Sequence, residues 1–174
     1  GSGTGEITVE KKLGHDFDAN GDCKRCGRKA EAKLSNSGTY YATAAEAIDA
    51  AAGTGEAVII VSYAADKTDP IILNKIVDLT VNNGVTVPEI RMESLPSQDT
   101  GNLSVKINNH GTVRLFSTPE TVNGRYQGVS YFNHNRTEQI KAASTIAVRT
   151  MQILNTDTGT IGEINISQTD NPTP

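Results

Sequence analysis

The chain has 174 residues, a formal net charge of −4, five Tyr, three Phe and no Trp, and 36% of its residues are hydrophobic. So few large side chains are typical of a thin core built from Val, Ile, Leu and Ala. The basic residues are scattered, which excludes the basic stripe of a nucleic-acid-binding protein. No stretch of about 18 apolar residues is present that could span a membrane.

Composition and motifs divide the chain into three parts. Residues 1–5 are a Gly-rich linker or expression scar and are left out of the fold. Residues 6–38 contain one His and both Cys residues, and we interpret them as a small hairpin module. Residues 39–174 form the main domain, which begins with a short helix.

The segment 14–27 contains the densest chemistry. Asn20-Gly21 is a hairpin-turn signal. Cys23-x-x-Cys26 has the spacing of a zinc knuckle, in which backbone amides stabilise two thiolates, and His15 across the hairpin is a candidate third ligand. Three interpretations stay open: a zinc site, a Cys23–Cys26 disulfide, which an extracellular location favours, and free thiols in a vestigial hairpin.

Acidic residues in the same segment imitate the opening of a calcium-binding loop. Asp16, Asp18, Asn20 and Asp22 alternate as the first ligands of an EF-hand do. The twelfth position, where a bidentate Glu belongs, is Gly27. We therefore expect a solvated acidic turn without calcium.

The knuckle resembles a short His…Cys-x-x-Cys-Gly module of bacterial surface proteins. In that module a further Cys lies two residues before the His, where this chain has Leu13. The resemblance therefore implies that a four-ligand site takes its last ligand from elsewhere, such as His110, His134 or an acidic side chain.

A short helix is predicted over 43–52. Thr43-Ala-Ala-Glu is a capping box, and Gly53 is a stop signal. The apolar face carries Ala47, Ile48 and Ala51. We expect this helix to cover the open end of the strands that follow it, because unpaired strand groups need a cap.

Four segments of the main domain repeat an apolar residue before Asn, with Thr a few positions later. The repeated residues are Asn82, Asn108, Asn133 and Asn155, followed by Thr86, Thr112, Thr137 and Thr160. The Asn spacings of 26, 25 and 22 residues lie in the range of solenoid repeats. Asn tolerates the left-handed corners of such coils, so we expect the four Asn side chains to form a column about 5 Å apart.

Strand signals accompany the repeat. The β-branched or alternating segments are Val58–Val61, Ile76–Val81, Leu103–Ile107, Val113–Phe116, Thr145–Ile153 and Ile161–Ile166. Together with the repeat they predict an all-β fold, a parallel β-helix or solenoid, with the helix as its N-terminal cap. A β-sandwich with Asn-rich turns is the alternative.

The start of the main domain resembles right-handed parallel β-helix domains in large surface proteins of Gram-positive gut bacteria. The resemblance rests on Tyr41–Ile48, Ala57–Val61 and Ile76–Val81 and extends over residues 40–166. It implies an extracellular, cell-surface location and a role as a stalk, an adhesin or a carbohydrate-associated module. Some members of this family cleave polysaccharides.

An aromatic and polar segment is the candidate ligand-binding surface. Tyrosine rings suit the apolar face of a sugar, and amide and guanidinium groups suit its hydroxyls. The candidate residues are Arg125, Tyr126, Tyr131, His134 and Arg136. In the alternative interpretation Phe132 belongs to the core and the tyrosines pack on a loop that leaves the solenoid.

Two carboxylate pairs are candidates for glycoside chemistry, Asp66 with Asp69 and Glu89 with Glu93. Exposed carboxylates are normally solvated, so we predict no catalysis. The predicted function is a non-catalytic extracellular scaffold or adhesin that binds host or dietary glycans or a host surface protein. The alternative is the β-helix part of a polysaccharide-degrading enzyme, a glycoside hydrolase or lyase, whose catalytic groups lie outside this sequence.

Overall fold

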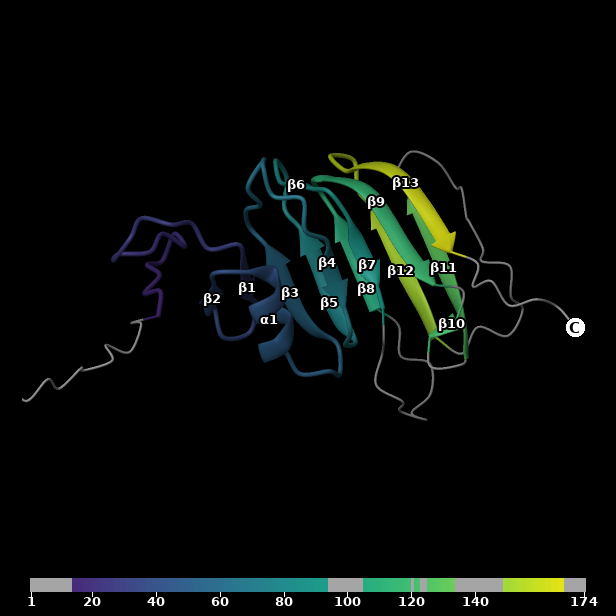
Figure 1. Ribbon diagram of the computed structural model, residues 1–174, viewed down its shortest axis with the longest axis horizontal. Helices are drawn as coiled ribbons and strands as arrows, with labels where there is room; N and C mark the ends of the chain where they lie inside the picture. Colours follow the sequence, from purple (N-terminus) through teal and green to yellow (C-terminus); the bar gives the residue numbers. More distant parts are fainter. Residues whose placement is uncertain (1–13, 94–104, 120, 123–124, 134–148, 168–174) are drawn as a thin grey trace, which may run out of the picture.

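The computed structural model describes residues 14–93, 105–119, 121–122, 125–133 and 149–167 (Figure 1). Their strands form two sheets, and one helix, α1 (Ala44–Ala50), lies near the N-terminal end. The strands of the first sheet are β1 (Ala32–Leu34), β2 (Tyr40–Tyr41), β3 (Glu56–Ile60), β5 (Val77–Val81), β8 (Val105–Asn109), β10 (Thr121–Val122), β11 (Arg125–Asn133) and β12 (Arg149–Asn155). Those of the second sheet are β4 (Ile71–Leu73), β6 (Thr86–Val87), β7 (Ile90–Met92), β9 (Thr112–Pro119) and β13 (Thr160–Ser167).

Most neighbouring strands run parallel. The first sheet has the order β10-β11-β12-β8-β5-β3-β1-β2, and its antiparallel pairs are β1 with β2, β1 with β3, and β10 with β11. The second sheet has the order β13-β9-β7-β4, with β6 paired to β9, and all of these pairs are parallel. Each of the six predicted strand segments overlaps an observed strand, and residues 103–104 and 145–148 of two of these segments lie outside the described residues.

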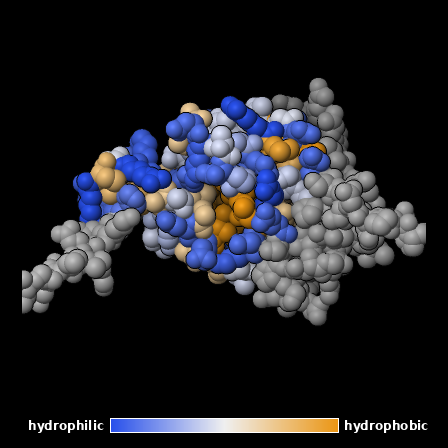
Figure 2. All heavy atoms as spheres, viewed as in Figure 1, coloured by the Kyte–Doolittle hydropathy of each residue, from blue (hydrophilic) through white to orange (hydrophobic). Residues whose placement is uncertain are grey.

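One apolar layer lies between the two sheets. In β5 the side chains of Val77, Leu79 and Val81 are buried, while the intervening residues are half-buried. The same core contains residues of the second sheet, such as Ile90 and Phe116. The described surface in Figure 2 is largely hydrophilic, with small apolar patches, because the apolar residues of both sheets turn inward.

The predicted β-helix is wrong. The structure is mixed α/β, and its described strands form two mostly parallel sheets, with no closed or solenoid sheet. The physical reason is that a repeat of Asn and Thr predicts which residues of neighbouring strands lie side by side, but not how the sheets are connected. Two separate parallel sheets satisfy the same register as the coils of a β-helix. Two facing layers also fit the β-sandwich alternative, but a sandwich of that kind is antiparallel.

The helix prediction is confirmed. The Thr43 hydroxyl oxygen accepts a hydrogen bond from the backbone N–H of Glu46 at 3.1 Å, which is the N-cap half of a capping box. Ala47 and Ile48 are buried. The helix ends at Ala50, before the predicted Gly53 stop.

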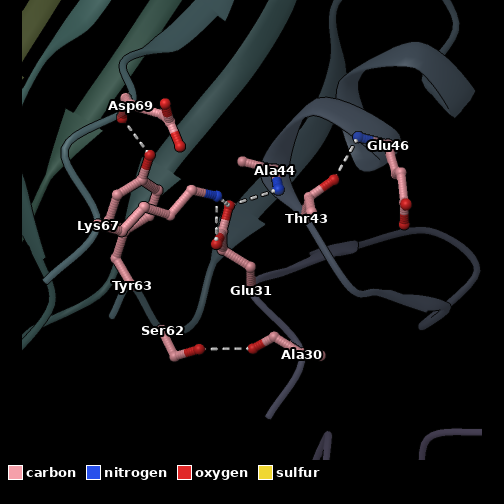
Figure 3. A network of polar contacts seen from close by, with 9 residues as sticks. All are labelled: Ala30, Glu31, Thr43, Ala44, Glu46, Ser62, Tyr63, Lys67 and Asp69. Atoms are coloured by element: carbon pink, nitrogen blue, oxygen red, sulfur yellow. Dashed lines mark hydrogen bonds and ion pairs between the residues drawn. The ribbon is translucent and has the colours of Figure 1, made fainter. Parts of the chain in front are cut away.

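A buried carboxylate connects this helix to the strands around it (Figure 3). Glu31 is 6% exposed and accepts hydrogen bonds from the backbone N–H of Ala44 at 2.8 Å and from Lys67 Nζ at 3.0 and 2.9 Å. Lys67 Nζ also lies 4.8 Å from the ring centre of Tyr63. Burial, together with the charges of Glu31 and Asp69, raises the pKa of Tyr63 to about 12. The ion pair between Glu31 and Lys67 therefore holds the helix and the loop after β3 against the segment before β1.

Lys67→Met should destabilise the fold by about 2–4 kcal/mol, because it leaves a buried carboxylate without its cation. The matched control is Lys29→Met, which breaks the exposed pair with Asp22 and should cost less than about 1 kcal/mol. Urea unfolding of both variants measures the difference. Equal losses would contradict a buried pair.

The predicted Asn column is present only in part, because Asn133 and Asn155 are in register whereas Asn82 and Asn108 are not. Asn133 pairs with Asn155, and Asn155 pairs with Asn109 rather than with Asn108. Asn109 is fully buried, and its amide nitrogen donates to Asn155 Oδ1 at 2.9 Å and to the Thr160 carbonyl at 3.1 Å.

The other two predicted members lie elsewhere. Asn108 donates to Asp78 Oδ1 at 2.9 Å and is half-buried, and Asn82 follows Val81, which is the residue that pairs with Asn109. Among the repeated threonines, Thr86, Thr112 and Thr160 are in register as predicted. Thr137 lies outside the described residues.

Asn109→Ala should lower the free energy of unfolding by about 2–3 kcal/mol, because the backbone N–H of Gly111 and the Asn155 side chain lose a buried partner. Asn108→Ala is the control and should cost less than about 1 kcal/mol, since Asn108 belongs to the outer row of the sheet. Thermal and urea unfolding of both proteins test this. A larger loss for Asn108→Ala would refute the observed register.

Candidate metal centre

A hairpin near the N-terminus brings His15 beside the two cysteines. Its turn is closed by Asp18, whose Oδ1 accepts from the backbone N–H groups of Asn20 at 2.8 Å and Asp22 at 3.0 Å. These backbone hydrogen bonds hold the pKa of the Asp18 carboxyl below its ordinary value. The predicted acidic turn therefore uses Asp18 to shape the hairpin.

Gly21 is required in this turn. Its φ of +79° is a left-handed conformation, and a Cβ there would lie 2.9 Å from Tyr40 Cε1. Beyond the turn, Phe17 and Cys23 form an antiparallel bridge, and the Lys24 N–H donates to the Asp16 carbonyl at 2.8 Å. The two sides of the hairpin are thus joined at the level of the cysteines.

A second tight turn holds Cys23 and Cys26 on the same side. The Gly27 N–H donates to the Cys23 carbonyl at 2.7 Å, and Gly27 has a φ of +72°. Backbone N–H groups of Arg25 and Cys26 bond to the Cys23 sulfur. This arrangement is typical of a knuckle that stabilises thiolates.

The three predicted ligands come together. The ligand atoms of His15, Cys23 and Cys26 all lie within 4.8 Å of one another. His15 Nδ1 and Cys26 Sγ are 3.4 Å apart. Zinc bond lengths at a tetrahedral angle would place such a nitrogen and sulfur about 3.6 Å apart, so the geometry fits a metal ion. The His15 ring is oriented by stacking on Phe17, with ring centres 5.5 Å apart.

The sulfur atoms differ in their surroundings. Cys23 is 3% exposed, whereas Cys26 and His15 are exposed, and neither thiol is in a disulfide. Burial raises the pKa of the Cys23 thiol, but hydrogen bonds from His15 and from the backbone outweigh it and bring the pKa down from 9.0 to about 6. Cys23 is therefore a thiolate at neutral pH, the form that binds metals.

The candidates for a fourth ligand lie elsewhere. His110 follows β8, and its Nδ1 lies 3.1 Å from the Thr156 hydroxyl. His134 lies outside the described residues. In the described part of the chain, the potential metal group has three members, His15, Cys23 and Cys26.

The predicted ligand-binding surface is described only in part. Arg125 and Tyr126 belong to β11, but the structure does not describe their side chains. His134 and Arg136 lie outside the described residues. Tyr131 is 9% exposed and belongs to the core, while its neighbour Phe132 is 48% exposed. The interpretation with Phe132 in the core is therefore wrong, because alternation along β11 turns Tyr131 inward.

The two carboxylate pairs have different surroundings. Asp66 and Asp69 are exposed in the loop after β3. Glu89 and Glu93 meet on either side of Arg91, with Glu89 Oε2 2.7 Å from Arg91 Nε and Glu93 Oε1 3.7 Å from Arg91 Nη1. The hydrogen bond from Arg91, opposed by burial and supported by Ser117, keeps the pKa of Glu89 below its ordinary value. An ionised Glu89 is poorly suited to act as a general acid.

Comparison with known proteins places the chain in no group. No protein-family model, curated protein or solved structure matches it. The resemblance to surface proteins of Gram-positive bacteria therefore stays a prediction. Within the described residues, no helix is long and apolar enough to cross a membrane.

In metal-free, reduced protein, one thiolate should form with a midpoint near pH 6 and the absorbance at 240 nm should report it. The Cys23→Ser variant should lack this transition. Because the pKa of Cys23 is lower in the folded protein than its ordinary value of 9.0, ionisation stabilises the hairpin fully above pH 9, and this effect is lost as the pH falls through 6. Two thiols that both ionise near pH 9 would contradict the described hydrogen bonds.

Proposed function

We propose that this chain is a non-catalytic scaffold module of a bacterial cell-surface protein and that zinc bound by His15, Cys23 and Cys26 stabilises its N-terminal hairpin. The observation that carries the zinc site is the approach of the three ligand atoms to within 4.8 Å of one another. Two sulfurs and one imidazole nitrogen are donors that zinc prefers.

The hairpin has little else to hold it together. In the described part of residues 14–30, the buried apolar residues are Cys23 and Ala30, and regular strand pairing is limited to two isolated bridges. So small a unit usually needs a metal or a disulfide to fold stably. Zinc would supply that stability, because a site that forms only in the folded chain adds its binding energy to folding.

A structural role suits this zinc better than a catalytic one. Three protein ligands leave the fourth position to water or to a group from another molecule, a pattern also found in enzymes. Catalytic zinc, however, acts in a dry, shaped cavity, whereas His15 and Cys26 are exposed on a hairpin.

The cell-surface location and the partners, host or dietary glycans or a host surface protein, rest on the sequence resemblance. The two-sheet body supports a scaffold role because its rows of outward side chains are fixed by parallel register. A rigid row of this kind offers a repeating surface to an extended partner.

Protein purified under reducing conditions without chelator should contain about one zinc ion per chain. His15→Ala, Cys23→Ser and Cys26→Ser should each weaken zinc binding by more than the roughly 10–100-fold that loss of an outer-shell partner costs. His110→Ala is the matched control, since His110 lies outside the cluster, and it should bind zinc normally. Elemental analysis and competition with a chromophoric chelator give these values.

Cobalt substitution provides a second measurement, because thiolate-to-cobalt charge transfer should appear in the wild-type protein and weaken in each cysteine variant. Metal-free protein under these conditions, with normal folding of the hairpin by nuclear magnetic resonance, would overturn the zinc proposal. For protein purified without reductant, a mass two hydrogens lower than expected would assign the cysteines to a disulfide instead.

A further inference from the structure

A groove of about 440 Å³ lies on the second sheet, away from the metal centre, and its lining exposes more apolar than polar surface. It crosses β7, β9 and β13, and the side chains that matter here are Glu89, Arg91, Glu93, Leu115, Ser117 and Asn165. Arg91 lies between Ile90 and Met92, which are fully buried, so its side chain turns to the outer face of the sheet. The volume is in the range of small-ligand sites.

Parallel register places one polar group of the groove on each strand. Arg91 of β7 pairs with Ser117 of β9, and Ser117 pairs with Asn165 of β13. Neighbouring strands lie about 4.8 Å apart, which is close to the length of one sugar ring in an extended chain. The groove therefore presents a regular row of hydrogen-bonding groups perpendicular to the strands.

The positive charge of Arg91 is matched by two carboxylates, so the groove keeps a formal charge of −1. Glu89 accepts from Arg91 Nε at 2.7 Å and Nη2 at 3.2 Å, and from the Ser117 hydroxyl at 2.7 Å. Glu93 lies on the other side of Arg91. Arg91 therefore has little attraction left for an anionic ligand, and the carboxylates are held apart by a cation that would repel a metal ion.

Considerable hydrogen-bonding capacity remains. A carboxylate oxygen accepts more than one hydrogen bond, so Glu89 and Glu93 can still accept from hydroxyl groups. Asn165 is exposed, and its amide has no hydrogen-bond partner among the described residues. Leu115 adds apolar surface beside these groups. Acceptors, an amide donor and an apolar patch together suit a neutral, polyhydroxylated ligand.

We propose that this groove binds an extended, uncharged glycan that crosses β7, β9 and β13, with hydroxyl groups donating to Glu89 and Glu93 and accepting from Arg91 and Asn165. The inference deepens the proposed scaffold function and rests on it for the absence of cleavage. It places glycan binding on the second sheet, not at residues 125–136.

The test uses the whole chain and an array of linear neutral oligosaccharides of gluco, xylo, manno and galacto type, with oligogalacturonate as the charged counterpart. At least one neutral oligosaccharide should bind, and oligogalacturonate should bind more weakly. Asn165→Ala should reduce affinity for that oligosaccharide about five-fold, the loss of roughly one hydrogen bond. Calorimetry measures the dissociation constants.

Gln152→Ala is the matched control, because Gln152 is an exposed amide on β12 of the other sheet and should leave affinity unchanged. Absence of binding across the neutral array, or equal affinity of the Asn165→Ala variant and the wild type, would overturn the groove. A preference for oligogalacturonate would overturn the neutral-ligand assignment.

Different results would refute glycan binding in the groove and the proposed function. Release of new reducing ends by the wild-type chain would refute the non-catalytic function, while binding that depends on Asn165 would still support the groove. Likewise, zinc-free protein that binds the same oligosaccharide through Asn165 would refute the zinc site and support the groove.

Discussion

The aliphatic layer shared by the two sheets is the constraint on which the rest of the structure depends. Val58, Leu79, Ile107 and Ile153 occupy equivalent positions on successive strands of the first sheet, and all are buried. Because side chains alternate along each strand, the residues on either side of a buried residue point to the outer face of the sheet. The row of Arg91, Ser117 and Asn165 is thus a consequence of core packing, and the groove they line is held by the sheet backbone.

Two requirements determine the residues in the turns between the sheets: there must be room for the backbones to approach, and buried polar groups must be hydrogen-bonded. A Cβ on Gly111 would lie 2.3 Å from the Val85 carbonyl oxygen, and one on Gly159 would lie 2.3 Å from the Asn109 carbonyl oxygen, so only glycine fits at either point. Asn109 and Asn155 are buried beside these glycines and bond each other as well as the turn backbone. Close approach of the backbones and full pairing of their polar groups therefore depend on the same residues.

The N-terminal hairpin and the groove on the second sheet present different kinds of chemical groups. The hairpin brings together soft sulfur and imidazole donors and has few buried apolar residues. The groove has oxygen and nitrogen groups that the register of the second sheet holds in a row. Between them, the buried Glu31–Lys67 pair joins the segment after the hairpin to the helix and to the loop after β3.

Local signals in the sequence determined the helix cap at Thr43, the Cys23-x-x-Cys26 turn with His15 opposite, and the strands whose apolar residues alternate. These depend on residues close in the chain, so spacing suffices to predict them. The two-sheet arrangement, the place of Asn109 in the column and the inward turn of Tyr131 were decided by tertiary structure. A shift of one residue reverses the face of a strand, and the parallel partners of β5 and β8 lie 28 residues apart (Asp78 and Lys106), so only packing of the whole core selects among such registers.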